Sequence, residues 1–152
     1  MNWGLEDFVM AGLMLSAVAG CFLLARRRSS GLAYLLAFAI MLGALFVTVF
    51  AWLAVGIIGS EDHPANLLYT GVIAVCAIGA VQARLRPAGM SRTLSIAAGL
   101  QAAITMLGAS LMAGEFTGAG FFAPLAFNAL LTGSLVISAW LFRVQDGLAA
   151  RT

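Results

Sequence analysis

Apolar residues in this chain form long uninterrupted runs instead of alternating with polar residues. Five such runs cover residues 8–25, 32–58, 64–83, 93–114 and 124–142. Each is close to the length of about 20 residues that a helix needs to cross the hydrocarbon core of a bilayer. A transmembrane barrel would instead show alternating segments of about 10 residues. The pattern predicts an all-α membrane protein, a single domain over residues 1–152 built as a bundle of five transmembrane helices.

Charged residues separate onto the two sides that these helices define. All eight basic residues are arginine, and the helix count places them on one side, within residues 26–28, 84–92 and 143–151. The other side carries five acids: Glu6, Asp7, Glu61, Asp62 and Glu115. Because arginine is retained on the cytoplasmic side of short loops, we expect the amino terminus outside and the carboxyl terminus in the cytoplasm. The same charge order around residues 8–25 argues against a cleaved signal peptide, which has its positive charges before the apolar stretch.

Composition narrows the class of protein and its partners. Hydrophobic residues make up 62% of the chain and charged residues 9%, whereas soluble domains are about 25% charged. A soluble fold and a disordered chain are both excluded, and a net charge of +2 gives no basic face for nucleic acid. The expected partners are the lipid bilayer and other membrane proteins or a second copy. The use of arginine without lysine, together with abundant alanine and glycine, is typical of a GC-rich bacterial genome, so we expect the bacterial inner membrane.

Small residues recur along three of the predicted helices. The stripes are Gly12, Ser16 and Gly20, then Gly71, Gly79 and Ala83, then Ser95, Gly99 and Ala103. Small side chains let helices approach closely in lipid. We interpret the stripes first as packing surfaces within the chain, and alternatively as surfaces for homo-oligomerisation.

Two predicted helices begin with a similar pattern. Pro64 precedes Asn66 and Gly71, and Pro124 precedes Asn128 and Gly133, with Leu and Thr at matching places between Asn and Gly. Proline suits the first turn of a helix, and asparagine there can bond freed backbone groups. The pattern is either a duplicated helical hairpin, with the second and third helices superposing on the fourth and fifth, or a coincidence in an apolar alphabet.

A small set of polar residues forms the candidate ligand cluster. Its members are Glu61, Asp62, His63, Asn66, Gln101, Glu115 and Asn128. Histidine and carboxylates can bind metals, but a simpler interpretation is that Asp62 or Ser60 caps the third helix. Gln101 is interpreted as an interhelical hydrogen-bonding residue, or alternatively as part of a polar substrate path.

Chemistry-bearing motifs are missing from the sequence. The five runs contain no charged residue, Cys21 and Cys76 form no C-x-x-C pair, and the single histidine lies outside the runs. No nucleotide-binding loop, hydrolase elbow or zinc-protease motif occurs. We therefore assign no catalytic, cofactor-binding or metal-binding residue.

Two segments resemble a group of small, uncharacterised bacterial integral membrane proteins. The first runs from Ala54 to Tyr69 and contains G-S-E-D-H-P-A-N-L, with His63 where the group often has Asn or Asp; the second is R-L-R-P-A-G-M-S-R at residues 84–92. The resemblance implies a membrane protein and transfers no activity. We expect a non-enzymatic accessory or scaffold subunit of a membrane complex. The alternative is a small homo-oligomeric channel or transporter, with Gln101, Asn66 and Asn128 along its path.

Overall fold

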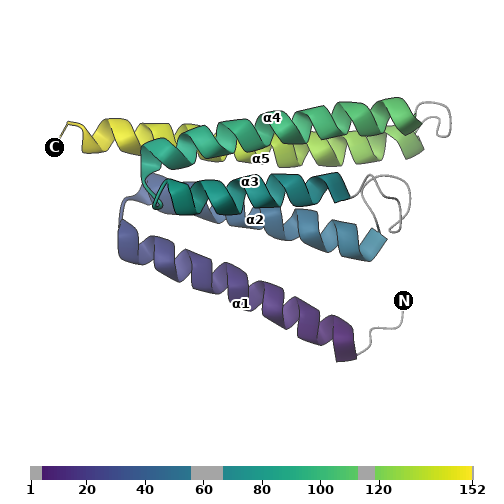
Figure 1. The fold of residues 1–152 in the computed structure, drawn as a ribbon, viewed down its shortest axis with the longest axis horizontal. Helices are drawn as coiled ribbons and strands as arrows, with labels where there is room; N and C mark the ends of the chain where they lie inside the picture. Colours follow the sequence, from purple (N-terminus) through teal and green to yellow (C-terminus); the bar gives the residue numbers. More distant parts are fainter. Residues whose placement is uncertain (1–4, 56–66, 113–118, 152) are drawn as a thin grey trace.

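The structure, a computed structural model, describes residues 5–55, 67–112 and 119–151. This part of the chain is helical apart from short turns, which confirms the all-α prediction (Figure 1). The helices are α1 (Leu5–Arg28), α2 (Leu32–Val55), α3 (Leu68–Gln82), α4 (Pro87–Met112) and α5 (Ala119–Ala149).

Four of these helices are long and apolar enough to cross a membrane: α1, α2, α4 and α5. The described part of α3 has 15 residues, about 22 Å at 1.5 Å per residue, which is shorter than the hydrocarbon core of about 30 Å. A multi-pass membrane protein is therefore supported by four helices, and the fifth span stays a prediction.

The expected starts of the third and fifth helices have different outcomes. The described part of α3 begins at Leu68, and Leu67 at its N-cap position makes no side-chain capping hydrogen bond. Pro64, and with it the cap expected from Asp62 or Ser60, lies outside the described residues, so that start stays a prediction. Helix α5 begins at Ala119 and contains Pro124 in its interior, so proline does not open it. A proline near a helix end removes only one backbone hydrogen bond. The helix therefore extends over the five residues before Pro124.

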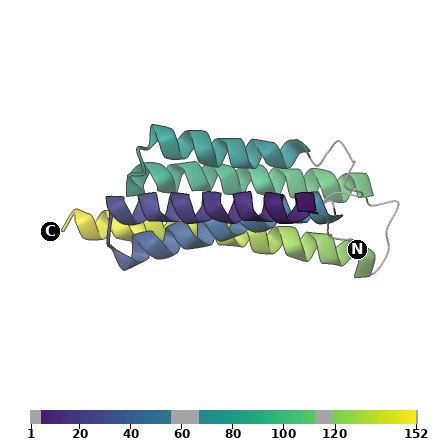
Figure 2. The same cartoon turned by 90° about the horizontal axis from the view of Figure 1, so that it is seen from below.

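The helices pack in an order that differs from their order in the chain. Helices α4 and α5 pack along their lengths, α2 packs on α5, α3 packs on α4, and α1 contacts mainly α2. Helices α2 and α3 make few direct contacts, and α1 diverges from the others toward its amino terminus (Figures 1 and 2). The centre of the bundle is therefore formed by α2, α4 and α5.

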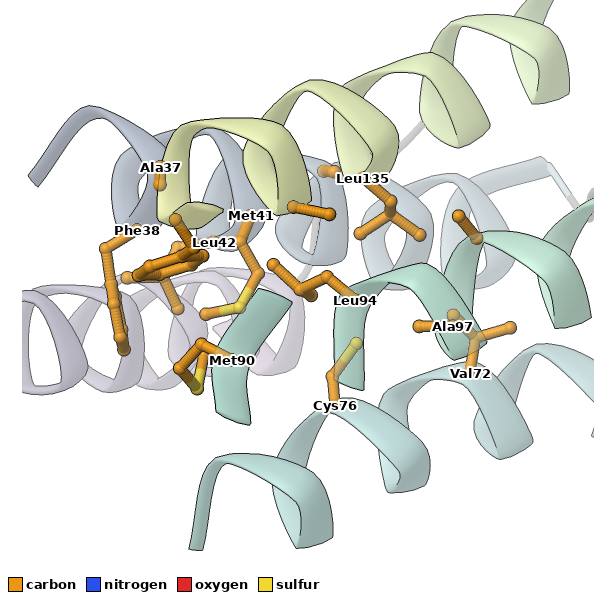
Figure 3. Packing of buried hydrophobic residues seen from close by; sticks show 14 of the residues in the cluster. Ala37, Phe38, Met41, Leu42, Val72, Cys76, Met90, Leu94, Ala97 and Leu135 are labelled. Atoms are coloured by element: carbon orange, nitrogen blue, oxygen red, sulfur yellow. The ribbon is translucent and has the colours of Figure 1, made fainter. Parts of the chain in front are cut away.

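The buried core follows from this arrangement. Phe38, Met41 and Leu42 of α2 face Met90 and Leu94 of α4, and residues of α3 and α5 complete the cluster (Figure 3). The Tyr34 and Phe142 rings meet edge to face with their centroids 5.3 Å apart, a geometry that aromatic rings favour.

The turns α1–α2 and α3–α4 and the C-terminal half of α5 lie at one end of the bundle (Figure 1). We call it the arginine-bearing end, because Arg28 reaches the α3–α4 turn and Arg143 reaches Ser91 of α4. In that turn Arg84 and Leu85 adopt φ of 50° and 57°, which is costly for residues with a Cβ. The turn is held because the Tyr34 hydroxyl donates to the Leu85 carbonyl at 2.9 Å.

The three small-residue stripes differ in whether they pack against another helix. The α3 stripe packs against α4 as expected: a Cβ at Gly79 would collide with the Thr93 side chain, and Ala83 lies against Gly89. The other two stripes face outward, because each of their residues in α1 and α4 is exposed. The expectation of packing within the chain is thus confirmed for α3 and wrong for α1 and α4, since an apolar helix in lipid has no need to bury every face.

The proposed hairpin duplication is not reproduced in the described residues. Helices α4 and α5 form a closely packed pair, whereas α2 and α3 do not. A Cβ on Gly71 would lie 3.7 Å from Leu100, while one on Gly133 would have no neighbour within 4 Å. Asn66, which the repeat pairs with Asn128, lies outside the described residues.

Candidate functional site

Three helices bring polar side chains together inside the bundle. Tyr69 comes from the first turn of α3, Gln101 from the middle of α4, and Asn128 from α5. Their exposed fractions are 0%, 1% and 3%, so all three face neighbouring helices rather than lipid. We call these three residues the polar cluster.

Asn128 is the centre of the polar cluster. Its Oδ1 accepts a hydrogen bond from the Tyr69 hydroxyl at 2.8 Å and a second from Gln101 Nε2 at 3.0 Å. Its Nδ2 donates to the Pro124 carbonyl at 3.0 Å, one turn earlier in α5. This local bond fixes the amide so that its oxygen faces α3 and α4, and one side chain thereby joins three helices.

One polar atom of the cluster has no hydrogen-bond partner among the residues that the structure describes. Gln101 Oε1 is buried and accepts no hydrogen bond from the described residues. An acceptor left unpaired in a protein interior costs about 1–3 kcal/mol. The side chain of Gln101 is therefore held by one hydrogen bond to Asn128, and the burial of its side-chain carbonyl oxygen is energetically unfavourable.

The structure assembles only part of the predicted ligand cluster. Gln101 and Asn128 are brought into direct contact, as the hydrogen-bonding interpretation of Gln101 predicted. The remaining five candidates, Glu61, Asp62, His63, Asn66 and Glu115, lie outside the described residues. Whether any of them converge on a ligand stays a prediction.

Sequence reasoning missed Tyr69. The signal was present, since a tyrosine inside an apolar run needs a partner for its hydroxyl when buried. Tyr69 lies three positions after Asn66, within the same first turn that the Pro–Asn pattern predicts. The partner itself, Asn128, is 59 positions away and could not be read from local pattern.

The polar cluster has little capacity for chemistry. It contains two neutral amides and a phenol, and it offers neither a carboxylate nor an imidazole for acid–base work. Among the residues that the structure describes, no group of three or more His, Cys, Asp or Glu side chains could hold a metal ion. What the arrangement can do is fix the register of α3, α4 and α5 by directional hydrogen bonds in an apolar medium.

Comparison with known proteins gives no family for the chain. The sequence matches no family model, and no curated protein or solved structure is significantly similar to it. The resemblance carried by the segments 54–69 and 84–92 therefore stays a prediction.

Proposed function

We propose that this chain is a non-enzymatic, multi-pass protein of the bacterial inner membrane that serves as an accessory or scaffold subunit of a membrane complex. The observation that carries the proposal is the small buried fraction of α1. Only 6% of its apolar span is buried, against 39% in both α2 and α4. A helix with so little packing in its own chain offers a surface for another membrane protein.

The open face of α1 suits close contact with a partner helix. Gly12, Ser16 and Gly20 are exposed, and a Cβ at either glycine would meet nothing within 4 Å. Small residues at this spacing let two backbones approach and gain van der Waals contact, which is a principal force between helices in lipid. On α4, Gly99 and Ala103 are exposed as well, and a Cβ at Gly99 would meet nothing within 4 Å.

The second candidate, a small homo-oligomeric channel or transporter, has one observation in its favour. The unpaired Oε1 of Gln101 is the kind of group that a polar path would hydrate. Against it, Gln101 and Asn128 are buried and bonded to each other, which favours a role as interhelical glue. The scaffold proposal is therefore the better supported of the two.

The α1 face can be tested by enlarging it. We expect Gly12→Leu combined with Gly20→Leu to reduce recovery of a crosslinked partner from native membranes at least fivefold, because overpacking a close contact costs about 1–3 kcal/mol. The matched control is Ala17→Leu, an exposed residue about 100° around the helix from Ser16. Crosslinking in intact membranes followed by purification and mass spectrometry measures the recovery. If the only recovered partner is a second copy of the chain, the scaffold proposal is wrong and α1 is a surface for homo-oligomerisation.

The proposed orientation predicts a one-sided labelling pattern. After Cys21 and Cys76 are replaced, a single cysteine at position 118 should react with an impermeant thiol reagent applied from the periplasm, and one at Ala88 should not. Ala88 is exposed in the first turn of α4, so its cysteine variant leaves the neighbouring Gly89 contact intact. Labelling at 88 but not at 118 would reverse the orientation.

A further inference from the structure

A cavity of about 810 Å³ lies between α1, α2 and α3. It lies where α2 and α3 make few direct contacts, and the C-terminal part of α1 borders it near the arginine-bearing end. Apolar side chains of all three helices line it, among them Leu24, Leu45 and Val81. Its size falls within the range of about 300–1,000 Å³ that is usual for small-molecule sites.

The charged side chains in this lining are all arginines. Arg27 and Arg28 from the end of α1 and Arg84 from the α3–α4 turn border the cavity, and its lining includes neither Asp nor Glu. Arg28 Nε and Nη2 both donate to the Arg84 carbonyl at 3.3 Å. These two bonds place the guanidinium at the cavity and leave three of its five N–H donors for another acceptor.

A smaller cavity of about 300 Å³ adjoins the first at the same end. It shares Arg28 and Leu85 with the larger one and adds Arg86, Ser29 and Tyr34. The combined space is apolar along the helices and positively charged where the helices end. The bilayer component that matches this distribution of apolar and positively charged residues is an amphiphile with an apolar chain and an anionic headgroup.

We propose that this space binds one anionic glycerophospholipid from the leaflet on the arginine-bearing side. Its acyl chain lies between α1, α2 and α3, and its phosphate accepts hydrogen bonds from Arg27, Arg28 and Arg84. Guanidinium groups bind phosphate through paired N–H donors, and basic pockets between transmembrane helices bind anionic lipid headgroups. The lipid site does not depend on a protein partner, so its test is independent of the test of the scaffold function.

The first test compares headgroups and arginines. The purified protein in neutral detergent is titrated with phosphatidylglycerol or phosphatidylcholine of the same acyl chains, and bound lipid is counted by native mass spectrometry. We expect one phosphatidylglycerol per chain and at least tenfold weaker phosphatidylcholine. Arg27→Gln and Arg84→Gln should each weaken phosphatidylglycerol about fivefold, the change that corresponds to about 1 kcal/mol per basic residue.

Matched controls make this test decisive. Arg26 and Arg92 are exposed and absent from the lining, so Arg26→Gln and Arg92→Gln should change the affinity less than twofold. If they weaken binding as much as Arg27→Gln does, the attraction is a general surface effect and the site is wrong. Equal affinity for the two lipids also overturns the proposal.

The second test addresses the apolar part of the cavity. Ala77 of α3 is exposed and lines the cavity, whereas Ala74, one turn earlier, is exposed and does not. Ala77→Phe should weaken phosphatidylglycerol binding at least tenfold, and Ala74→Phe should leave it unchanged. Binding of glycerol phosphate as tight as that of the lipid would show that the chain is not recognised and would contradict the proposal. If circular dichroism shows that Ala77→Phe is misfolded, the arginine comparison decides.

Discussion

Replacing Asn128 with leucine should destabilise the bundle by about 1–3 kcal/mol, more than either other change in the polar cluster. Leucine has a similar size but no acceptor, so the Tyr69 hydroxyl and Gln101 Nε2 both lose the oxygen that they share. Hydrogen bonds between helices in a membrane average about 0.6 kcal/mol and reach about 1.7 kcal/mol. Two are lost here, and both former donors stay buried.

The other two members of the cluster provide the comparison. Tyr69→Phe removes one bond and should cost about 0.6 kcal/mol. Gln101→Leu removes one bond together with the unpaired Oε1, so we expect its effect to be near zero. Unfolding of the purified variants in mixed micelles with increasing sodium dodecyl sulfate, followed by far-ultraviolet circular dichroism, gives the free energies. An Asn128→Leu variant as stable as the wild type would mean that the cluster does not join the helices.

Gly89→Ala should destabilise the protein by about 1–3 kcal/mol, although alanine is normally the better helix former. A Cβ at position 89 would lie 2.5 Å from the Ala83 Cβ and 3.1 Å from the Ala83 Cα. These atoms belong to the backbone or are fixed to it, so no side-chain rotation relieves the collision. The α3–α4 turn, which already contains two residues at positive φ, would have to move.

Gly99→Ala is the matched control for this prediction. Gly99 lies in the same helix, and a Cβ there would have no neighbour within 4 Å. Its replacement should therefore be neutral or stabilise the protein by up to about 1 kcal/mol. The same detergent unfolding measurement applies to both variants. Equal stability of the Gly89 and Gly99 variants would show that α3 and α4 do not approach closely at residue 89.

The sequence predicted an all-α chain with long apolar helices because hydropathy reports directly on length and continuity in lipid. It could not predict which faces pack. In water a buried face is the apolar one, but lipid is as apolar as leucine, so exposed residues such as Leu13 and buried ones such as Leu94 look alike in the sequence. The open face of α1 and the gap between α2 and α3 therefore had no signal in the pattern.

The candidate site was predictable only in part for a related reason. Gln101 and Asn128 stand out as amides in apolar runs, and their burial follows from the cost of leaving a polar group in lipid. Their contact depends on the register between α4 and α5, which packing across the whole interface determines. The positive φ of Arg84 and Leu85 was also hidden, because the residues that adopt this conformation most easily are glycine and asparagine, and neither stands at position 84 or 85.

The central position of α5 has a consequence for how the protein is made. Helices α2 and α4 are synthesised before α5, yet each makes its main contact with α5. Ser138 of α5 also donates to the Ala37 carbonyl of α2 across 101 positions of sequence. Chains that stop before residue 119 would contain α2 and α4 without the helix that joins them. Quality-control proteases of the membrane should therefore remove chains that lack α5 quickly, whereas chains that contain it are spared.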